Sequence, residues 1–395
     1  MKITGKTLLR IDRLFWLPHR LSGFLSNVFG KIHKNESNQV LLIKFMGLGS
    51  IIHLSSLCNK NNVDRSRVML LTLEANRPLC DLIGFSNTRF VRTNGLLVFC
   101  KDCVRILLSM RQQRPALIID YERCSHAVGF FRTLLGLIAQ SKTLSFEKER
   151  TLSTEKRVIY SIKDFNQEEL FLKGIEFLPQ AISQTSVRKV ESNPFKILIN
   201  INASNYLLAR RYSIDRFAEV IRELHEWNPL LEFYLTGSTE EKSYVELLEK
   251  QLTGLPIKNV TGKWDLEKLQ KELLTSSLFI TCDSGPLHLA VELGASTIAV
   301  WGPTQPEHFG YEKIDHLHNI SLRLRCAPCF KHPASDPAYA CHGRIDCLKE
   351  LSSTIITNKA KHILSSKQSD SGQQNALTST FGEGLSVTND VKLFQ

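Results

Sequence analysis

Long apolar runs are absent from this sequence of 395 residues. Because no stretch of about 20 apolar residues occurs, the sequence predicts no transmembrane helix. The N-terminus is basic, but Arg13, His19 and Arg20 interrupt its apolar residues and no small-residue cleavage site follows, which argues against a secretory signal. Ten cysteines are too sparse for a disulfide scaffold, so we expect a reducing compartment.

Composition indicates a folded, basic protein. Hydrophobic residues make up 43% and charged residues 23%, which excludes a fully disordered or low-complexity chain. The length suits one large or two medium domains. A net charge of +11 favours a negatively charged partner: nucleic acid, anionic lipid, a phosphorylated glycan or a nucleotide.

Residues 1–38 carry a large share of that charge. Seven basic and two acidic residues give the segment a net charge of +5, and Trp16 and Phe24 are among its apolar residues. A basic amphipathic helix of this kind is typical of a segment that lies on an anionic membrane surface. The alternative interpretation is a helix packed on the protein's own core.

From residue 39 onwards, short apolar runs alternate with helical patterns. Such runs are typical of strands in a parallel sheet. They lie at residues 40–44, 68–72 and 116–120, and, after a polar joint near 187–194, at 196–201, 232–236, 278–281 and 297–301. We therefore expect an α/β protein with two doubly wound, Rossmann-like domains, 39–190 and 191–365, facing a cleft. The polar tail 366–395 is expected to be disordered.

The most specific stretch is Asp283-Ser-Gly-Pro-Leu-His-Leu-Ala290, followed by Gly294 and Gly302-Pro-Thr304. It reads as a strand end, a tight turn and a helix start, with Asp283 or Ser284 as the helix cap and Pro286 in the first turn. Free N–H groups at such a helix start bind phosphate, and Gly285 would allow a ligand to approach the backbone closely.

This stretch resembles the signature of glycosyltransferase family 9, the ADP-heptose:lipopolysaccharide heptosyltransferases. Leu41-Leu-Ile-Lys-Phe-Met-Gly-Leu-Gly-Ser50 resembles the family's first strand and glycine loop, and Asn259-Val-Thr-Gly-Lys263 its Asn-Leu-Thr-Gly-Lys stretch. The resemblance covers roughly residues 39–364. It implies a GT-B fold, with the acceptor on the N-terminal domain, a nucleotide sugar such as ADP-heptose on the C-terminal domain, and inverting, metal-independent transfer.

The resemblance also implies a donor site. Arg210 falls where the family carries a phosphate-binding lysine, with Arg211 as an alternative, and Glu241 or its neighbour Glu240 would bind the nucleoside side. The full set of expected donor-binding residues is Asn202, Ser204, Arg210, Gly237, Glu241, Asp283, Ser284, Gly285, Pro286 and His288.

The proton acceptor is where this sequence departs from the family pattern. The family usually has an aspartate, the proposed general base, at the position of Ser50. A serine cannot take that role unaided near neutral pH. Asp120 and Glu122, at the end of a strand of the same domain, are the expected replacements, and His53 is a third candidate.

Four cysteines cluster at Cys326, Cys329, Cys341 and Cys347. Four sulfurs in such a short stretch can form a closed structural site for zinc or iron. Free thiols or two disulfides are the alternatives.

These observations predict a glycosyltransferase that moves a sugar, a heptose first of all, from a nucleoside diphosphate to a saccharide or lipid-linked acceptor in cell-envelope polysaccharide synthesis. We expect a cytoplasmic enzyme, peripheral at the inner face of the membrane through residues 1–38. The alternatives are another nucleotide sugar in capsule or exopolysaccharide assembly, or a non-catalytic relative that lost its base. No nucleic acid is expected, since no reading motif occurs.

Overall fold

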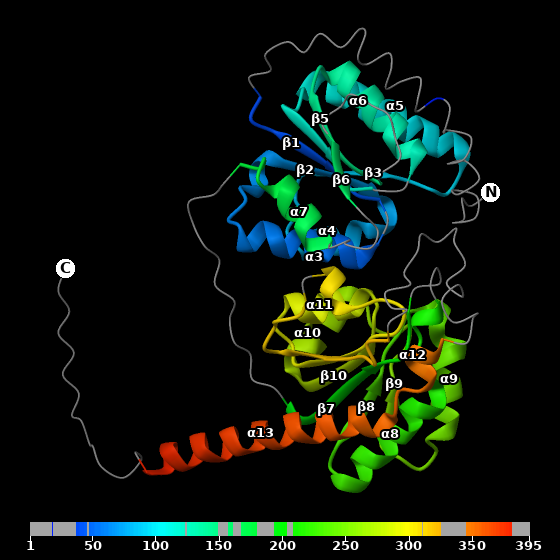
Figure 1. Ribbon diagram of the computed structural model, residues 1–395, viewed down its shortest axis with the longest axis vertical. Coiled ribbons are helices and arrows are strands. Elements are labelled where there is room, and N and C mark those ends of the chain that lie inside the picture. Colours follow the sequence, from blue (N-terminus) through cyan, green and yellow to red (C-terminus); the bar gives the residue numbers. More distant parts are fainter. Residues whose placement is uncertain are drawn as a thin grey trace, which may run out of the picture.

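A computed structural model of the chain describes Pro18 and residues 37–45, 47–122, 125–148, 157–160, 167–179, 193–203, 208–309, 311–324 and 345–380. Two six-stranded parallel sheets organise these residues (Figure 1). The first contains β1 (Val40–Ile43), β2 (Val68–Leu73), β3 (Thr88–Val91), β4 (Leu117–Asp120), β5 (Lys142–Lys148) and β6 (Arg157–Tyr160). The second contains β7 (Asn193–Asn200), β8 (Glu232–Leu235), β9 (Ile257–Asn259), β10 (Ser276–Cys282), β11 (Thr297–Val300) and β12 (Leu317–Ile320).

Both sheets have the same strand order. It is β3-β2-β1-β4-β5-β6 in the first and β12-β11-β10-β7-β8-β9 in the second, which is one topology repeated. In each sheet the order reverses between the first and fourth strands, where Ile43 pairs with Asp120 and Asn200 with Thr281. Ligands of doubly wound sheets bind beyond the carboxyl ends of the strands at this switch point. The prediction of two doubly wound sheets is confirmed.

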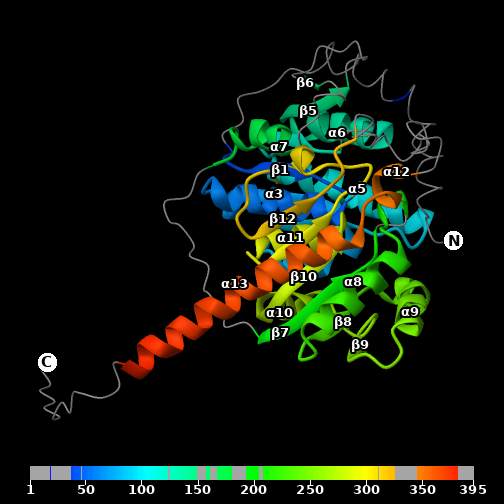
Figure 2. The same cartoon turned by 60° about the horizontal axis from the view of Figure 1, so that its bottom comes forward.

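Helices cover both faces of each sheet (Figures 1 and 2). On the first sheet, one face carries α5 (Leu96–Gln113) and α6 (His126–Ala139), and the other carries α3 (Leu48–Lys60), α4 (Arg77–Leu82) and α7 (Gln167–Ile175). On the second sheet, α10 (Leu266–Thr275) and α11 (Gly285–Glu292) face the first half, and the outer helices are α8 (Ile214–Trp227), α9 (Lys242–Gln251) and α13 (Ser353–Thr380). The short α12 (Asp346–Lys349) precedes α13. Among the described helices, none combines the length and apolar character that crossing a bilayer requires.

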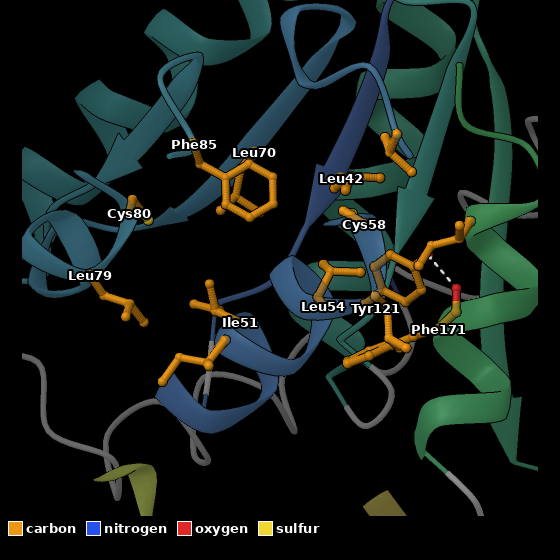
Figure 3. Packing of buried hydrophobic residues seen from close by; sticks show 14 of the residues in the cluster. Leu42, Ile51, Leu54, Cys58, Leu70, Leu79, Cys80, Phe85, Tyr121 and Phe171 are labelled. Carbon is orange, nitrogen blue, oxygen red and sulfur yellow. Dashed lines mark hydrogen bonds between the residues drawn. The ribbon is translucent and has the colours of Figure 1, made fainter. Parts of the chain in front are cut away.

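The core beneath β1 is continuous and aromatic on one side (Figure 3). Every residue of β1 is buried, as expected for a central strand covered on both faces. Tyr121 stacks on Phe146 and meets Phe171 edge-on, and its hydroxyl donates to the Phe171 carbonyl at 3.2 Å. A Cβ at Gly174 would lie 2.0 Å from that hydroxyl, so a glycine is needed where α7 crosses the tyrosine.

The two halves meet through α3 and α11, and Leu289 and Ala290 of α11 belong to the same apolar cluster as Ile51 and Leu54 of α3. The closest approach is at Gly49, where a Cβ would lie 2.0 Å from Cδ2 of His288. At the other end of this contact, Asn59 Nδ2 donates to Glu292 Oε1 at 3.4 Å.

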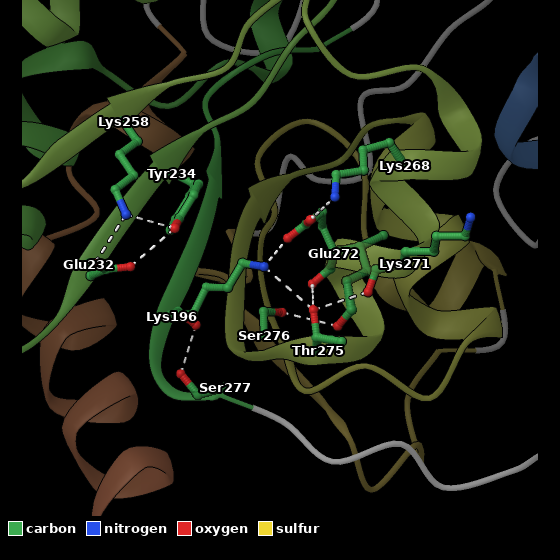
Figure 4. A network of polar contacts seen from close by, with 11 residues as sticks. Lys196, Glu232, Tyr234, Lys258, Lys268, Lys271, Glu272, Thr275, Ser276 and Ser277 are labelled. Atoms are coloured by element: carbon green, nitrogen blue, oxygen red, sulfur yellow. Dashed lines mark hydrogen bonds and ion pairs between the residues drawn. The ribbon is translucent and has the colours of Figure 1, made fainter.

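A polar network fastens the amino-terminal part of β7, away from the switch point (Figure 4). Lys196 pairs with Glu272 of α10, and its ammonium lies 5.2 Å from the centre of the Tyr234 ring. Lys258 donates to the Tyr234 hydroxyl at 2.9 Å and pairs with Glu232 at 3.0 Å. These contacts tie α10, β8 and β9 to the central strand.

The helix α13 extends further than the sequence predicted. It continues to Thr380, whereas a disordered tail was expected from Ser366, and this boundary is therefore corrected. The polar stretch contains no proline, so the helix that buries Ile356, Ala360 and Leu364 against the second sheet can continue past Leu364. Residues 381–395 lie outside the described residues.

Replacing Gly49 with alanine tests the contact between the halves. Because the new Cβ would overlap the His288 ring, we expect Gly49→Ala to lower the free energy of unfolding by about 1–3 kcal/mol. Thermal unfolding measures this loss. Gly95→Ala is the matched control, since a Cβ there would meet only Val98 Cγ2, at 4.0 Å. Equal melting temperatures for the two variants would contradict the contact.

Candidate functional site

The switch point of the second sheet gathers polar side chains from β7 and β10. Asn200 Nδ2 and Ser284 Oγ lie 3.4 Å apart, and Ser284 Oγ lies 3.2 Å from Thr281 Oγ1. Asn202 follows β7 and is held by its backbone N–H, which donates to Asn200 Oδ1 at 2.9 Å. The structure thus brings Asn202 and Ser284, both predicted site residues, to one edge of the sheet.

Asp283 is the charged centre of this cluster and is fully buried. Its Oδ2 accepts a hydrogen bond from Thr304 at 2.6 Å and pairs with Arg210 Nη1 at 3.0 Å. Burial alone would raise the pKa of Asp283, but the charge and hydrogen bond of Arg210, together with His288 and the Thr304 hydrogen bond, outweigh burial and hold the pKa below its usual value. Within the described part of the chain, the second oxygen, Oδ1, is buried without a hydrogen-bond partner, and so is Oδ1 of Asn202.

His288 lies one turn into α11, against Asp283. Its Nε2 is 3.9 Å from Asp283 Oδ1, and its Nδ1 is hydrogen-bonded to the Tyr311 hydroxyl at 2.8 Å. Burial lowers the pKa of His288 to about 4, partly opposed by Asp283. The ring is therefore neutral at pH 7, so Arg210 supplies the positive charge beside Asp283.

The expectation that Asp283 or Ser284 caps α11 is wrong, since Ser284 occupies the N-cap position but its side chain makes no capping hydrogen bond. The Asp283 carboxylate is instead engaged by Arg210 and Thr304. The N–H groups of the first turn therefore keep their capacity to donate to a ligand. The start of α3 is also without a side-chain cap, and a Cβ at Gly285 would lie 3.7 Å from Leu48 Cβ. Two helix N-termini thus converge where the halves meet.

The end of β8 completes this edge. A Cβ at Gly237 would lie 2.8 Å from Asn202 Nδ2 and 3.3 Å from Glu241 Oε2, so the glycine keeps these groups close together. Glu241 Oε2 accepts from the Ser238 N–H at 2.8 Å in a capping box, which fixes the turn. Arg211 stacks over the Tyr244 ring at 4.0 Å. The donor-site residues in the described part of the chain therefore share one edge.

Ser50 lies in the first turn of α3, next to the glycine that touches His288. Its hydroxyl donates to Gln167 Oε1 at 3.3 Å, and Gln167 Nε2 lies 3.4 Å from His53 Nδ1. Burial, reinforced by the charges of His288 and Lys60, lowers the pKa of His53 to about 3. His53 is therefore a packed, neutral histidine that orients Gln167 and, through it, Ser50.

Asp120 and Glu122 occupy the switch point of the first sheet. Glu122 Oε2 accepts from the Phe45 N–H at 2.9 Å and from Lys44 Nζ at 3.2 Å, which fastens the glycine loop. Asp120 Oδ1 accepts from the Glu122 N–H at 2.8 Å, and its Oδ2 lies 3.7 Å from the buried Arg132. Burial raises the pKa of Asp120 to about 7 despite Arg132.

Some predicted residues fall outside the described part of the chain. Ser204, Cys326, Cys329 and Cys341 are among them, as are residues 1–38 apart from Pro18 and residues 37–38. Cys347 lies in α12 and is buried. Among the described residues, no three His, Cys, Asp or Glu side chains are grouped to hold a metal ion.

The residues of these clusters that were not predicted as site residues include Thr304, Gln167, Tyr311 and Arg132. Thr304 was part of the quoted signature, whose spacing did not assign it a role. Gln167, Tyr311 and Arg132 contact their partners across 12 to 117 positions of the chain, for which the sequence pattern carries no local signal.

Comparison with known proteins gives consistent matches. The profile of glycosyltransferase family 9 (heptosyltransferase) matches residues 139–340. A lipooligosaccharide heptosyltransferase 2 of Campylobacter jejuni is 23% identical over 229 residues, which cover 54% of this chain and 69% of that protein.

Two solved structures have a similar fold. The glycosyltransferase family 9 protein of Veillonella parvula has a TM-score of 0.63 and 16% identity, with 85% of this chain and 99% of that chain covered. The ADP-heptose heptosyltransferase II of Escherichia coli has a TM-score of 0.57 and 15% identity, with 84% and 99% covered.

The neutral histidine His53 predicts a pH dependence of stability. Because its folded-state pKa of about 3 lies below the unfolded value near 6.5, its contribution is complete above pH 6.5 and is lost as the pH falls towards 3. The slope approaches about 1.4 kcal/mol per pH unit. Urea unfolding of wild type and His53→Gln across pH 4–8 measures it: the difference between the two should shrink with falling pH. A difference that is constant with pH would contradict the buried neutral state.

Proposed function

The chain belongs to glycosyltransferase family 9, and on that premise we propose that this glycosyltransferase moves a heptose from a nucleoside-diphosphate donor to a saccharide or lipid-linked acceptor of cell-envelope polysaccharide. In our proposal residues 191–365 bind the donor and residues 39–190 present the acceptor. The transfer is inverting and needs no catalytic metal: the acceptor oxygen attacks the anomeric carbon while the diphosphate leaves.

The main support for the donor site is a pair of buried side-chain oxygens. Among the residues that the structure describes, Asp283 Oδ1 and Asn202 Oδ1 are buried acceptors without hydrogen-bond partners, at the switch point beside the start of α11. Buried polar atoms are rarely left unsatisfied in proteins. A ligand with hydroxyl donors and anionic oxygens, which is what a nucleotide sugar offers, would satisfy both the acceptors and the N–H groups of α11.

The two arginines have different roles in this proposal. Arg210 pairs with the buried Asp283 and keeps that carboxylate ionised. Arg211 stacks on Tyr244, and its buried Nε has no hydrogen-bond partner among the described residues, so its guanidinium can donate to the leaving diphosphate. The positive end of α11 and Arg211 together would stabilise the charge that develops on the phosphates.

We propose Asp120 as the proton acceptor. A general base works best with a pKa near the operating pH, and burial raises the pKa of Asp120 to about 7. Glu122 holds the backbone of the glycine loop and is the second candidate. Ser50, whose proton is directed at Gln167, would accept a hydrogen bond from the acceptor hydroxyl and orient it.

Two alternatives stay open within this proposal. The donor would be another nucleotide sugar, for capsule or exopolysaccharide assembly, if the pocket selects a different sugar. The exchange of the usual aspartate for Ser50 favours a non-catalytic relative that binds the donor without turnover.

We also propose a cytoplasmic, peripheral location at the inner face of the membrane, which would bring the enzyme to a lipid-linked acceptor. The basic segment 1–38 supports this proposal by its charge and its apolar residues. A structural zinc or iron site at the four cysteines stays a prediction.

Substituting the two arginines separates their roles. Arg211→Ala should weaken ADP binding about tenfold to a hundredfold, because a charge-assisted hydrogen bond is lost, with little change in melting temperature. Arg210→Ala should also lower the free energy of unfolding, by about 3–5 kcal/mol, because Asp283 is left buried and uncompensated. Calorimetric titration with ADP and UDP measures binding, and Arg222→Ala on α8 is the control. Unchanged affinity in Arg211→Ala for whichever nucleotide binds would contradict the assignment.

The pH dependence of turnover tests the base. In the wild type, kcat/KM for donor consumption should rise with pH to a plateau above about pH 7, and Asp120→Asn should lower kcat about a hundredfold to ten-thousandfold. Ser50→Ala should change kcat far less. An unchanged pH profile in Asp120→Asn would exclude Asp120. A wild type that binds a nucleotide but consumes no donor would favour the non-catalytic alternative.

A further inference from the structure

The outer surface of α5 carries an unusual stripe of side chains, which we call the α5 face. It consists of Leu97, Lys101, Val104, Leu108 and Arg111, spaced four, three, four and three residues apart, so that all five lie on one side of the helix. Leu97 is 86% exposed, Val104 54% and Leu108 57%. Apolar and basic residues therefore share the face of a helix that points away from its own core.

The fold does not need this stripe. The opposite side of α5 contributes Ile106 and Met110 to the core, with Phe99 and Leu107 packed against them. Figure 1 shows α5 and α6 as the layer of the first sheet farthest from the second half. The α5 face is thus directed away from the donor site and from the contact between α3 and α11.

The exposed charged side chains of α5 and α6 are positive. The only acidic residue in α5 and α6 is Asp102, which is 1% exposed and binds Arg92 through both oxygens. Arg105, beside the α5 face, has a side chain that is 63% exposed. A layer with exposed leucines, exposed cations and no exposed carboxylate is complementary to a surface that is apolar inside and negative outside.

A groove adjoins this layer on the side of the edge strand β3. It has a volume of about 400 Å³ and lies between α5 and β3. Its lining includes Arg77, Arg89, Arg92 and Arg105 together with Glu74. Glu74 pairs with Arg77, and Asp102 pairs with Arg92 and Arg105, so the four arginines leave a net positive charge here. Guanidinium groups bind phosphate through paired N–H donors. The groove extends the positive potential of the α5 face.

From this arrangement we propose that the α5 face is a membrane-docking surface, which rests on an anionic phospholipid bilayer with α5 parallel to the bilayer plane. The leucines and the valine would enter the boundary between headgroups and acyl chains, and the cations would lie among the headgroup phosphates. The inference deepens the proposed function, since it relies on a lipid-linked acceptor as the reason for docking.

Two other occupants fit the charge less well. Residues 1–38 carry a net charge of +5 and would be repelled by a basic surface. A second copy docked face to face would set Lys101 and Arg111 against the same residues of its partner. An anionic bilayer attracts both the α5 face and the N-terminal segment, so the two would bind it together.

Vesicle sedimentation of the full chain tests the proposal. The vesicles contain phosphatidylcholine with or without phosphatidylglycerol, and no acceptor. One variant combines Leu97→Gln, Val104→Gln and Leu108→Gln, and a second combines Lys101→Glu with Arg111→Glu. Leu230→Gln with Leu247→Gln is the matched control, since these leucines are 66% and 50% exposed on the second half. We expect each α5 variant to bind anionic vesicles at least about tenfold more weakly than wild type, and the control to bind like wild type.

Melting temperature, ADP binding, vesicle binding and oligomeric state are compared between the variants and wild type. Melting temperatures and ADP binding without vesicles should match wild type in both α5 variants, which separates this proposal from the donor site. Vesicle binding equal to wild type in both variants would overturn the docking surface. So would a dimeric wild type that becomes monomeric in the glutamine variant with unchanged vesicle binding, because the stripe would then be an interface between copies.

Discussion

The candidate site depends on the contact between α3 and α11. The helix that follows the first strand of one sheet packs on the helix that follows the fourth strand of the other, and each of these strands borders a switch point. The contact is close because Gly49 has no side chain where it meets the His288 ring. The glycine therefore sets the spacing at which the starts of α3 and α11 lie next to each other, and in our proposal the donor binds there.

Buried ion pairs occupy both switch points. Arg210 with Asp283 lies in the second sheet, and Arg132 with Asp120 in the first, all four side chains being largely or fully buried. Buried pairs of this kind add little net stability, because the desolvation of both charges offsets their attraction. Their effect is on the protonation of the two aspartates, through the electrostatic field at each switch point. Asp283 is held ionised by a close arginine, whereas Asp120, 3.7 Å from its arginine, has a pKa raised to about 7.

The sequence predicted the elements that have strong local signals. The apolar runs of β1, β2, β4, β7, β8, β10 and β11 and the signature at the start of α11 were found because strand patterning and helix-start residues are local properties. Strands β3, β5, β6, β9 and β12 were not predicted. All of them except β5 are only three or four residues long, and β3, β5, β6 and β9 carry charged residues such as Arg89, Lys142 and Lys258. The capping role expected of Asp283 failed because a distant threonine and an arginine bind its carboxylate.

A serine at position 50 affects the electrostatics at the start of α3. A carboxylate in the first turn of α3 would neutralise the positive end of that helix and would itself have a lowered pKa. Ser50 leaves the end of α3 positive beside the equally uncapped α11, which favours a diphosphate between them but disfavours a weakly acidic proton acceptor in the same field. A base with a pKa near 7 must therefore lie in a buried environment set back from the helix ends. Asp120, held behind the glycine loop through Glu122, meets that condition.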